Sequence, residues 1–214
     1  MNNNTINSKP YWEHRFNSGN WGRNGQLQTE EYAKANVENL NINKDFTGSI
    51  LDFGCAQGDA IPIYLKAFPN AKIFGIDISE SAIAKCNKKF GNIAEFYSGD
   101  TTKITYKDIV IASHVMEHIP KDKNIVKNLL TKCTDLFVFV PYKEEPLYFE
   151  HVNYYDENYY NELNVYSTKI FNVSYKIRLS FKSLIRNLLY FKFFLYNKFS
   201  KNIIMFHIKG ASID

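Results

Sequence analysis

Short apolar runs alternate with amphipathic stretches over most of this chain. Near-continuous apolar character is typical of strands that are buried on both faces, and five segments show it: 49–53, 71–77, 92–100, 108–114 and 135–142. Helical spacing of apolar residues marks four segments: 27–40, 59–68, 79–91 and 121–132. The alternation predicts a doubly wound, Rossmann-like α/β fold with a mostly parallel sheet.

The two ends of the chain are less regular. Residues 1–10 are polar and are expected to be frayed. Towards the other end the pattern predicts a short helix at 156–163, a strand at 165–176, a helix at 178–200 and a closing strand at 202–209. We therefore expect seven strands, an N-terminal helical cap over 1–44 and a main domain over 45–214. A helical insert would precede the last strand, and the whole would form a single domain.

Composition narrows the class of protein. The chain has 214 residues, enough for one domain with a substantial core, and only three cysteines, Cys55, Cys86 and Cys133. A sparse, odd count argues against a disulfide scaffold and favours a reducing, cytoplasmic location. The N-terminal residues lack the apolar core of a signal peptide, and no apolar run of membrane-spanning length is free of charge.

The net charge of +4 is unevenly distributed. Residues 163–213 hold nine Lys or Arg and no Asp or Glu, so a basic, aromatic C-terminal part follows a mildly acidic body. Such a surface suits nucleic acid, anionic lipid or an anionic substrate, but it also suits an ordinary solvated face. The segment 178–200 could pack on the core, join a second copy of the chain, or lie on a membrane surface. We favour core or dimer packing.

The most informative text is ILDFGCAQGDA, where the first predicted strand runs into a glycine-rich turn. Gly54 allows a sharp turn, and Gly58 allows the next helix to start close to a ligand. Asp77 ends the second predicted strand, where a carboxylate can accept hydrogen bonds from both hydroxyls of a ribose. Asp52 lies just before the turn and would repel a pyrophosphate but attract an ammonium or sulfonium group. The loop therefore favours a cationic nucleoside over a dinucleotide.

These motifs resemble those of class I S-adenosylmethionine-dependent methyltransferases, and of their type-11-like small-molecule branch in particular. ILDFGCAQG, IFGIDIS, GDTTKI and DIVIASHVMEHI are similar to successive family motifs, and the resemblance extends over 45–165 and 202–209. It implies S-adenosylmethionine as cofactor and S-adenosylhomocysteine as product. The residues that it places around the cofactor, besides Asp52 and the glycines, are Cys55, Asp77, Ile78, Asp100, Thr101, Ser113 and His114. Ala56 departs from the family, which usually has glycine there.

The segment YWEHRF is similar to one that precedes the fold in some of these enzymes. The resemblance implies that Trp12 and Arg15 close over the methionyl end of the cofactor, and a bidentate arginine–carboxylate contact is physically reasonable. The alternative is that the tryptophans only pack the cap onto the sheet.

Three histidines are candidate general bases. His114 ends the fourth predicted strand, His118 follows one turn later, and His151 lies beyond the fifth strand. Each has a structural alternative, as a loop anchor or as a cofactor contact without proton transfer. Residues 114–118 also spell H-x-x-E-H, a zinc-protease pattern, but Pro120 follows too soon for the required helix. We expect no metal.

The acceptor is weakly marked. Tyrosines that could form its wall are Tyr148, Tyr154, Tyr155, Tyr159 and Tyr160, although packing is the simpler role for most of them. We expect a small polar acceptor, such as a sugar, a sugar nucleotide or a phosphorylated intermediate of bacterial surface-glycan synthesis, by association with similar enzymes. A nucleic-acid methyltransferase acting on tRNA or rRNA is the alternative, although no RNA-binding module is recognised. A non-catalytic cofactor-binding module is the third reading.

Overall fold

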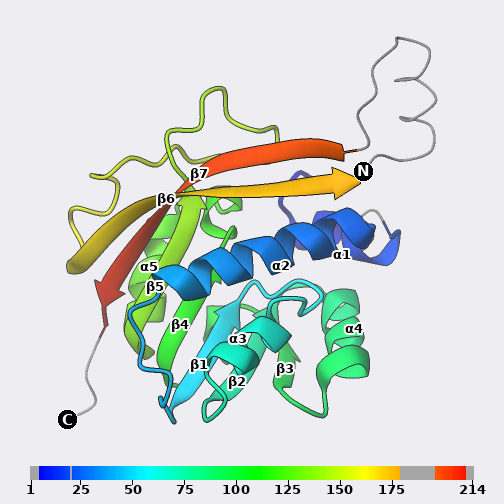
Figure 1. Cartoon of the computed structure of the whole chain (residues 1–214), viewed down its shortest axis with the longest axis horizontal. Helices are drawn as coiled ribbons and strands as arrows, with labels where there is room; N and C mark the ends of the chain where they lie inside the picture. The colour runs from blue at the N-terminus through cyan, green and yellow to red at the C-terminus, as the bar shows by residue number, and fades with distance from the viewer. Residues whose placement is uncertain (1–4, 20, 179–195, 211–214) are drawn as a thin grey trace.

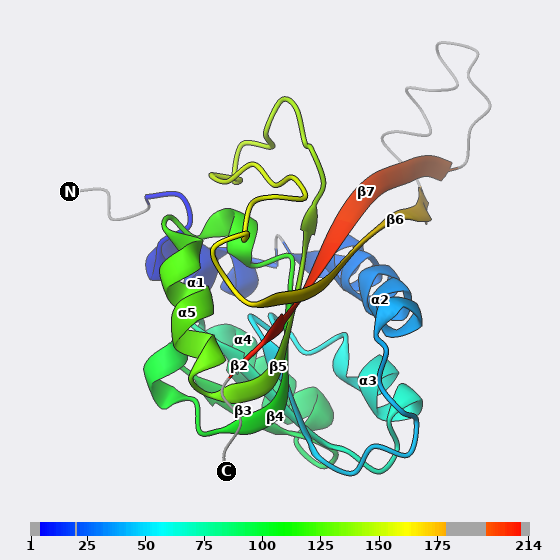
Figure 2. The same cartoon turned by 90° about the vertical axis from the view of Figure 1, so that its left-hand side faces the viewer.

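The computed structural model describes residues 5–19, 21–178 and 196–210. Its centre is a seven-stranded sheet with the order β3-β2-β1-β4-β5-β7-β6, shown in Figures 1 and 2. The strands in chain order are β1 (Ser49–Phe53), β2 (Lys72–Asp77), β3 (Glu95–Ser98), β4 (Lys107–Ser113), β5 (Cys133–Pro141), β6 (Val165–Arg178) and β7 (Tyr196–Lys209). The doubly wound, mostly parallel fold expected from the sequence is confirmed.

Strand direction changes once across the sheet. β1 to β5 pair in parallel, whereas β7 is antiparallel to both β5 and β6. β6 and β7 are 14 residues each and form a long ribbon that extends past the parallel strands. The carboxyl ends of β1, β2 and β4 therefore meet at one edge of the sheet, where ligands bind in open α/β sheets.

Helices cover both faces of the sheet. They are α1 (Lys9–Asn17), α2 (Gly22–Asn39), α3 (Ile61–Ala67), α4 (Glu80–Phe90) and α5 (Asp122–Leu130), with short 3-10 turns at Thr101–Lys103 and Met116–His118. α2 and α3 lie on one side of the sheet and α5 lies on the other (Figure 2). Pro62 is tolerated because it sits in the first turn of α3, where no backbone donor is lost.

Alternate residues of the central strands pack into two separate hydrophobic cores, one on each face of the sheet. Ile50 and Ile111 point towards α2 and α3, whereas Leu51 and Val110 point towards α5. All four are fully buried, which explains the near-continuous apolar runs in the sequence.

Three expectations about the ends of the chain need correction. Residues 5–8 are ordered, and Ser8 caps α1 by accepting a hydrogen bond from the Tyr11 amide. Residues 156–163 form turns rather than a helix, because the hydroxyls of Tyr159 and Tyr160, together with that of Tyr155 just before the segment, converge on the buried carboxylate of Asp122. The flanks of the predicted helix 178–200 belong to β6 and β7, and its centre lies outside the described residues.

Within the described ranges, no helix combines the length and the apolar character needed to cross a membrane.

Candidate cofactor and acceptor site

The turn after β1 is built as the sequence predicts. The amides of Gly54 and Cys55 both donate to the carbonyl oxygen of Ile76 in β2, which ties the turn to the neighbouring strand. Gly54 has a φ of +76°, and a Cβ added there would lie 2.3 Å from Val115 Cγ2. Gly58 also has a positive φ, +77°, and it packs against α4. Both glycines are therefore required by backbone conformation and by space.

Two carboxylates are buried beside this turn. Asp77 accepts hydrogen bonds from the Ala56 amide and from the Ser79 amide, both at 2.9 Å. Burial raises the pKa of Asp77 to about 6, against the opposing effect of these backbone hydrogen bonds. Burial and the nearby Asp77 raise the pKa of Asp52 to about 7. Two carboxylates without a cationic partner among the described residues create a negative potential that a cationic ligand would relieve.

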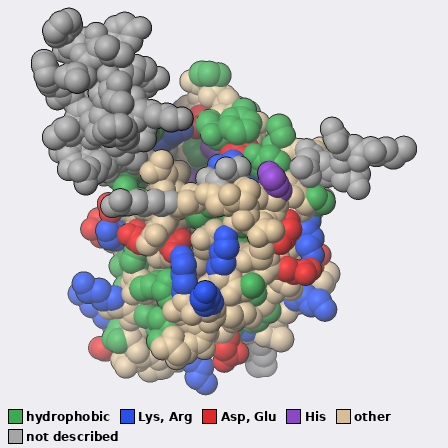
Figure 3. All heavy atoms as spheres, turned by 90° about the vertical axis from the view of Figure 1, so that its right-hand side faces the viewer, with side chains coloured by type: hydrophobic (Ala, Val, Ile, Leu, Met, Phe, Trp, Pro, Cys, Tyr) green, Lys and Arg blue, Asp and Glu red, His purple; other side chains and the backbone are tan. Residues whose placement is uncertain are grey.

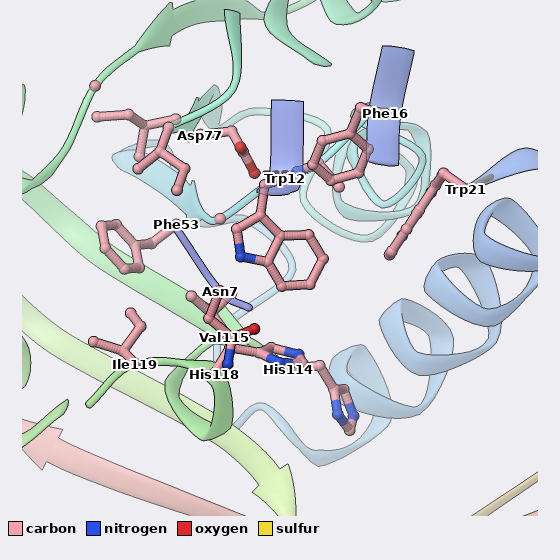
Figure 4. Close-up of a pocket in the computed structure, with 15 residues that line it drawn as sticks. Asn7, Trp12, Phe16, Trp21, Phe53, Asp77, His114, Val115, His118 and Ile119 are labelled. Atoms are coloured by element: carbon pink, nitrogen blue, oxygen red, sulfur yellow. Dashed lines mark hydrogen bonds between the residues drawn. The ribbon is translucent and has the colours of Figure 1, made fainter. Parts of the chain in front are cut away.

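A cavity opens above the turn. Its walls come from the strand ends and from the N-terminal segment (Figure 4). The lining residues are Asn7, Trp12, Phe16, Trp21, Phe53, Gly54, Ala56, Ile76, Asp77, Ile78, Gly99, His114, Val115, His118 and Ile119. The mostly apolar lining, with a few polar groups, is typical of a small-molecule site.

A second cavity adjoins the first one. The two share Trp21, Gly54, Ala56 and His114, and the second extends to Asp52, Cys55 and Ser113. Three polar atoms around these cavities are buried without a hydrogen-bond partner among the described residues: Asn7 Oδ1, Trp21 Nε1 and His114 Nε2. Buried polar atoms are nearly always paired in native proteins, so these atoms fit a ligand with polar groups of its own.

The N-terminal helix α1 covers the cavity and is fastened at both sides. Trp12 and Phe16 point towards the cavity, and Trp21 joins them from the start of α2 (Figure 4). On one side Glu13 accepts a hydrogen bond from the Ser79 hydroxyl at 2.7 Å, at the start of α4. On the other side Arg15 Nη1 lies 2.5 Å from Glu150 Oε1 in the loop between β5 and β6. The cap thus spans the mouth of the site.

The predicted cofactor residues do not all come together. Trp12, Gly54, Asp77, Ile78 and His114 line the first cavity, and Asp52, Cys55 and Ser113 line the second. Arg15 instead pairs with Glu150, which is only 3% exposed, so its guanidinium serves the cap rather than the cavity wall.

The third predicted motif also lies aside from the cavity. Asp100 is exposed, and its Oδ1 accepts a hydrogen bond at 2.8 Å from the Thr102 amide, so it caps the 3-10 turn. Thr101 is buried in that turn, where its carbonyl accepts from Lys132. Gly99 is the residue of this motif that reaches the cavity. Neither Asp100 nor Thr101 lines either cavity, and the adenine contact of Asp100 stays a prediction.

The three candidate bases form one cluster with Glu117. His114 Nδ1 lies 3.0 Å from Glu117 Oε1, and the His118 and His151 rings are 5.0 Å apart. Burial lowers the pKa of His118, which keeps its imidazole neutral at pH 7. Burial alone would raise the pKa of Glu117, but the hydrogen bond from His114 and the neighbouring imidazoles lower it overall. Glu117 is therefore ionised although it is 1% exposed.

Sequence reasoning missed the residues that connect distant parts of the site. Asn7 and Glu150 are joined by a 2.6 Å hydrogen bond across 143 positions, from the Asn7 amide to the Glu150 carbonyl. Phe16 and Trp21 complete the aromatic cap but are separated from the motifs by more than 30 residues. No local spacing marks such pairs, although the unusual aromatic content of 11–23 was a signal for the cap.

The sheet order, the glycine turn and the acidic pair define a class I S-adenosylmethionine-dependent methyltransferase fold. Residues 50–135 match the family model described as a methyltransferase domain, which confirms the resemblance drawn from the motifs. The matched segment runs from β1 into the start of β5 and so includes the glycine turn, Asp77 and the His114–His118 stretch.

Individual relatives agree with this class. The chain is 28% identical to the ribosomal RNA small subunit methyltransferase C of Shewanella sediminis, over 73% of this chain and 55% of that protein. The chain thus spans about half the length of this curated relative. A putative methyltransferase solved in complex with the Haloferax volcanii Trm112 activator matches with a TM-score of 0.66 and 11% identity, covering 94% of this chain and 98% of that chain. The plantazolicin methyltransferase BpumL, solved with S-adenosylhomocysteine, matches with a TM-score of 0.59 and 16% identity, over 96% of each chain.

Proposed function

We propose that this protein transfers the methyl group of S-adenosylmethionine to a small polar acceptor. The observation that carries the proposal is the pair of buried carboxylates, Asp52 and Asp77, on either side of a strained glycine turn beside the cavity. The cofactor bears a sulfonium and an ammonium group, and both would lower the electrostatic cost of these carboxylates. The relatives solved with S-adenosylhomocysteine support the same cofactor.

In this proposal the chain supplies alignment and a dry site, while the bound cofactor supplies an already activated methyl group. Asp77 lies on the cavity wall, where it could accept hydrogen bonds from the ribose hydroxyls. Asp52 lies in the adjoining cavity, where it would face the cationic end of the cofactor. Trp12, Phe16 and Trp21 would exclude water from the reacting centre.

The acceptor would enter between the aromatic cap and the loop 142–164. This loop exposes a group of large apolar side chains, Leu147, Tyr148, Phe149, Val152 and Tyr154. Figure 3 shows hydrophobic side chains gathered at the top of the molecule, where Figure 1 places the loop. None of the comparisons described above supports a place in surface-glycan synthesis, so that expectation is not carried into the proposal.

Calorimetric titration with S-adenosylhomocysteine tests the cofactor. We expect micromolar binding, about −8 kcal/mol, and at least a tenfold loss for Asp77→Ala. Asp45→Ala is the matched control, because Asp45 is exposed and lies before β1. No heat with the wild type, while thermal unfolding shows that it is folded, would contradict the proposal.

A nucleic-acid acceptor is the second candidate, favoured by the similarity to a ribosomal RNA methyltransferase. Two lysines of the basic C-terminal part are already neutralised by ion pairs, Lys201 with Glu144 and Lys209 with Asp135. A fluorescence titration with tRNA and with small-subunit rRNA fragments across salt concentrations separates the two candidates. A steep fall of affinity with salt would favour the nucleic acid, because each phosphate contact releases counterions.

A further inference from the structure

Three side chains with metal-binding atoms converge beside the cavity. Glu117 and His118 come from the 3-10 turn after β4, and His151 comes from the loop between β5 and β6. One carboxylate oxygen and one nitrogen from each histidine all lie within 4.8 Å of one another. Two chain segments more than 30 positions apart therefore bring a carboxylate and two imidazoles to one point.

The hydrogen bonds of these residues leave a free lone pair on each one. His118 Nδ1 lies 3.2 Å from the Glu150 carbonyl oxygen, which can only accept, so Nδ1 carries the proton and Nε2 keeps its lone pair. His151 Nδ1 contacts the Glu144 carboxylate, and the same reasoning leaves its Nε2 free. Glu117 Oε1 is bound to His114, whereas Oε2 is buried with no partner among the described residues.

This arrangement has the second layer of contacts that metal ligands require. Histidine ligands of metals usually donate their other nitrogen to a carboxylate or a carbonyl, which fixes the tautomer and the ring orientation. Here Glu144, the Glu150 carbonyl and His114 hold His151, His118 and Glu117 in that manner. A buried carboxylate oxygen without a partner is costly, and a cation would remove that cost.

The donor set selects the kind of ion. Two imidazoles and one carboxylate suit Mn²⁺, Fe²⁺, Co²⁺ or Zn²⁺, whereas Mg²⁺ and Ca²⁺ favour oxygen ligands throughout. Ligand atoms about 2.1 Å from one ion lie about 3–3.5 Å apart, so modest rotations of the side chains would close the site. Three protein ligands would leave open positions for the acceptor and for water.

We propose that Glu117, His118 and His151 hold a divalent transition-metal ion that binds a hydroxyl oxygen of the acceptor. His118 lines the cofactor cavity and packs edge-on against Trp12 at 5.0 Å, so the ion would lie at the border between cofactor and acceptor. This assignment rests on the proposed function, replaces the predicted base roles of His118 and His151, and reverses our expectation of no metal.

The ion would supply Lewis acidity, which lowers the pKa of a bound hydroxyl. The acceptor hydroxyl would release its proton to solvent, and its oxygen would form a bond to the methyl carbon while the carbon–sulfur bond breaks. The bonding pair would remain on sulfur, so that the products are a methyl ether, S-adenosylhomocysteine and one proton. The inferred substrate class is therefore an alcohol rather than an amine.

Metal binding by the full chain tests this site directly. Chain stripped with EDTA and dialysed is titrated with Mn²⁺ by calorimetry, and Co²⁺ is added in parallel to record its visible absorption. We expect one ion per chain, at least tenfold weaker Mn²⁺ binding for Glu117→Gln and for His151→Gln, and a changed Co²⁺ spectrum in both. His14→Gln is the matched control, because His14 is exposed on α1, and its affinity should stay within twofold.

The outcomes separate this inference from the proposed function. The metal site is overturned if the wild type does not bind Mn²⁺, or if the variants bind it as well as the wild type does. Titration of the stripped protein with S-adenosylhomocysteine tests the cofactor independently, since neither Asp52 nor Asp77 belongs to the metal cluster. His151→Gln keeps the test valid if Glu117→Gln fails to fold, because His151 lies in a loop rather than beneath the sheet edge.

Discussion

Two parts of this site differ in how their buried carboxylates are compensated. One part surrounds the glycine turn (the cofactor half), and the other surrounds Glu117 and Glu150 (the acceptor half). Asp52 and Asp77 both lie beside the glycine turn, and burial raises the pKa values of both. In the other half Glu150 pairs with Arg15, and the pKa of Glu117 is lowered by its hydrogen bond with His114 despite its burial. The first pair lacks a cationic partner among the described residues. In the second pair Glu150 is compensated by Arg15, whereas Glu117 keeps one buried oxygen without a partner among the described residues.

The difference shows what each half contributes. Buried carboxylates without a cationic partner cost folding free energy, and the proposed cationic cofactor would offset that cost. Paired carboxylates hold segments in place, and here they fasten the cap and orient the histidines.

Gly54→Ala should have the largest effect on the stability of the cofactor half. The substitution places a Cβ 2.3 Å from Val115 Cγ2 at a φ of +76°, so the free energy of unfolding should fall by about 2–4 kcal/mol. Gly19→Ala is the control: φ is +80° there, but nothing lies within 4 Å, so about 1 kcal/mol is expected from backbone strain alone. Equal losses in the two variants, measured by urea unfolding, would contradict the steric account.

Arg15→Ala should lower the free energy of unfolding by about 3 kcal/mol, because it leaves the Glu150 carboxylate, which is only 3% exposed, without its cationic partner. Lys9→Ala removes an exposed ion pair between Lys9 on the same helix and Glu80 on α4, and the free energy of unfolding should stay almost unchanged. The double variant Arg15→Ala with Glu150→Gln should recover part of the loss. A double variant no more stable than Arg15→Ala would show that the unpaired charge is not the cause.

The acidic pair predicts how stability depends on pH. Folding raises both pKa values above that of a free aspartate, about 3.9, so between pH 4 and 7 the folded chain binds more protons than the unfolded one. Their contribution to the free energy of unfolding is therefore greatest below about pH 4 and is lost as pH rises through about 6 and 7. Asp52→Asn should make the free energy of unfolding depend less on pH, and it should stabilise the cofactor-free protein at pH 8 by about 1–3 kcal/mol.

Thermal unfolding of the wild type and Asp52→Asn from pH 5 to pH 8 measures the effect. The same variant should bind S-adenosylhomocysteine less tightly, so that stability and binding move in opposite directions. A variant that is less stable than the wild type at pH 8 would show that Asp52 has a stabilising partner after all.

Ala56→Gly should have the smallest effect. Ala56 adopts a φ of +48°, and glycine relieves that strain, so the free energy of unfolding should rise by up to about 1 kcal/mol. The midpoint of thermal unfolding would then rise by about 2–4 °C. A lower midpoint would mean that the Ala56 methyl contributes more through its packing with Phe16 and Ala82 than the strain costs.

The sequence predicts the cofactor half well because its determinants are local. A glycine turn, the acidic residue before it and the acid at the end of the next strand lie within 26 positions, and adjacent parallel strands bring them together. The order of strands and helices through β5 follows from the same regular alternation.

The acceptor half is assembled from residues far apart, and its details could not be predicted. Glu150 meets Arg15 and Asn7 across more than 130 positions, and neither periodicity nor a motif marks that contact. The predicted helix at 156–163 is wrong because Tyr159 and Tyr160 donate hydrogen bonds to the Asp122 carboxylate at the start of α5, a tertiary interaction that overrides local spacing. Asp100 was assigned by its motif position, but its carboxylate is used to cap the adjacent turn.

The two attachments of α1 affect how fast a bound molecule leaves the site. One side of this nine-residue helix is held to the start of α4 through Glu13, and another side is held to the loop beyond β5 through Arg15. A molecule bound beneath Trp12 and Phe16 would leave more readily when at least one attachment opens. The residence time of that molecule therefore depends on how often the helix opens as well as on the molecule's own contacts. A helix that opens more often would release product sooner but would also hold the unreacted cofactor less well.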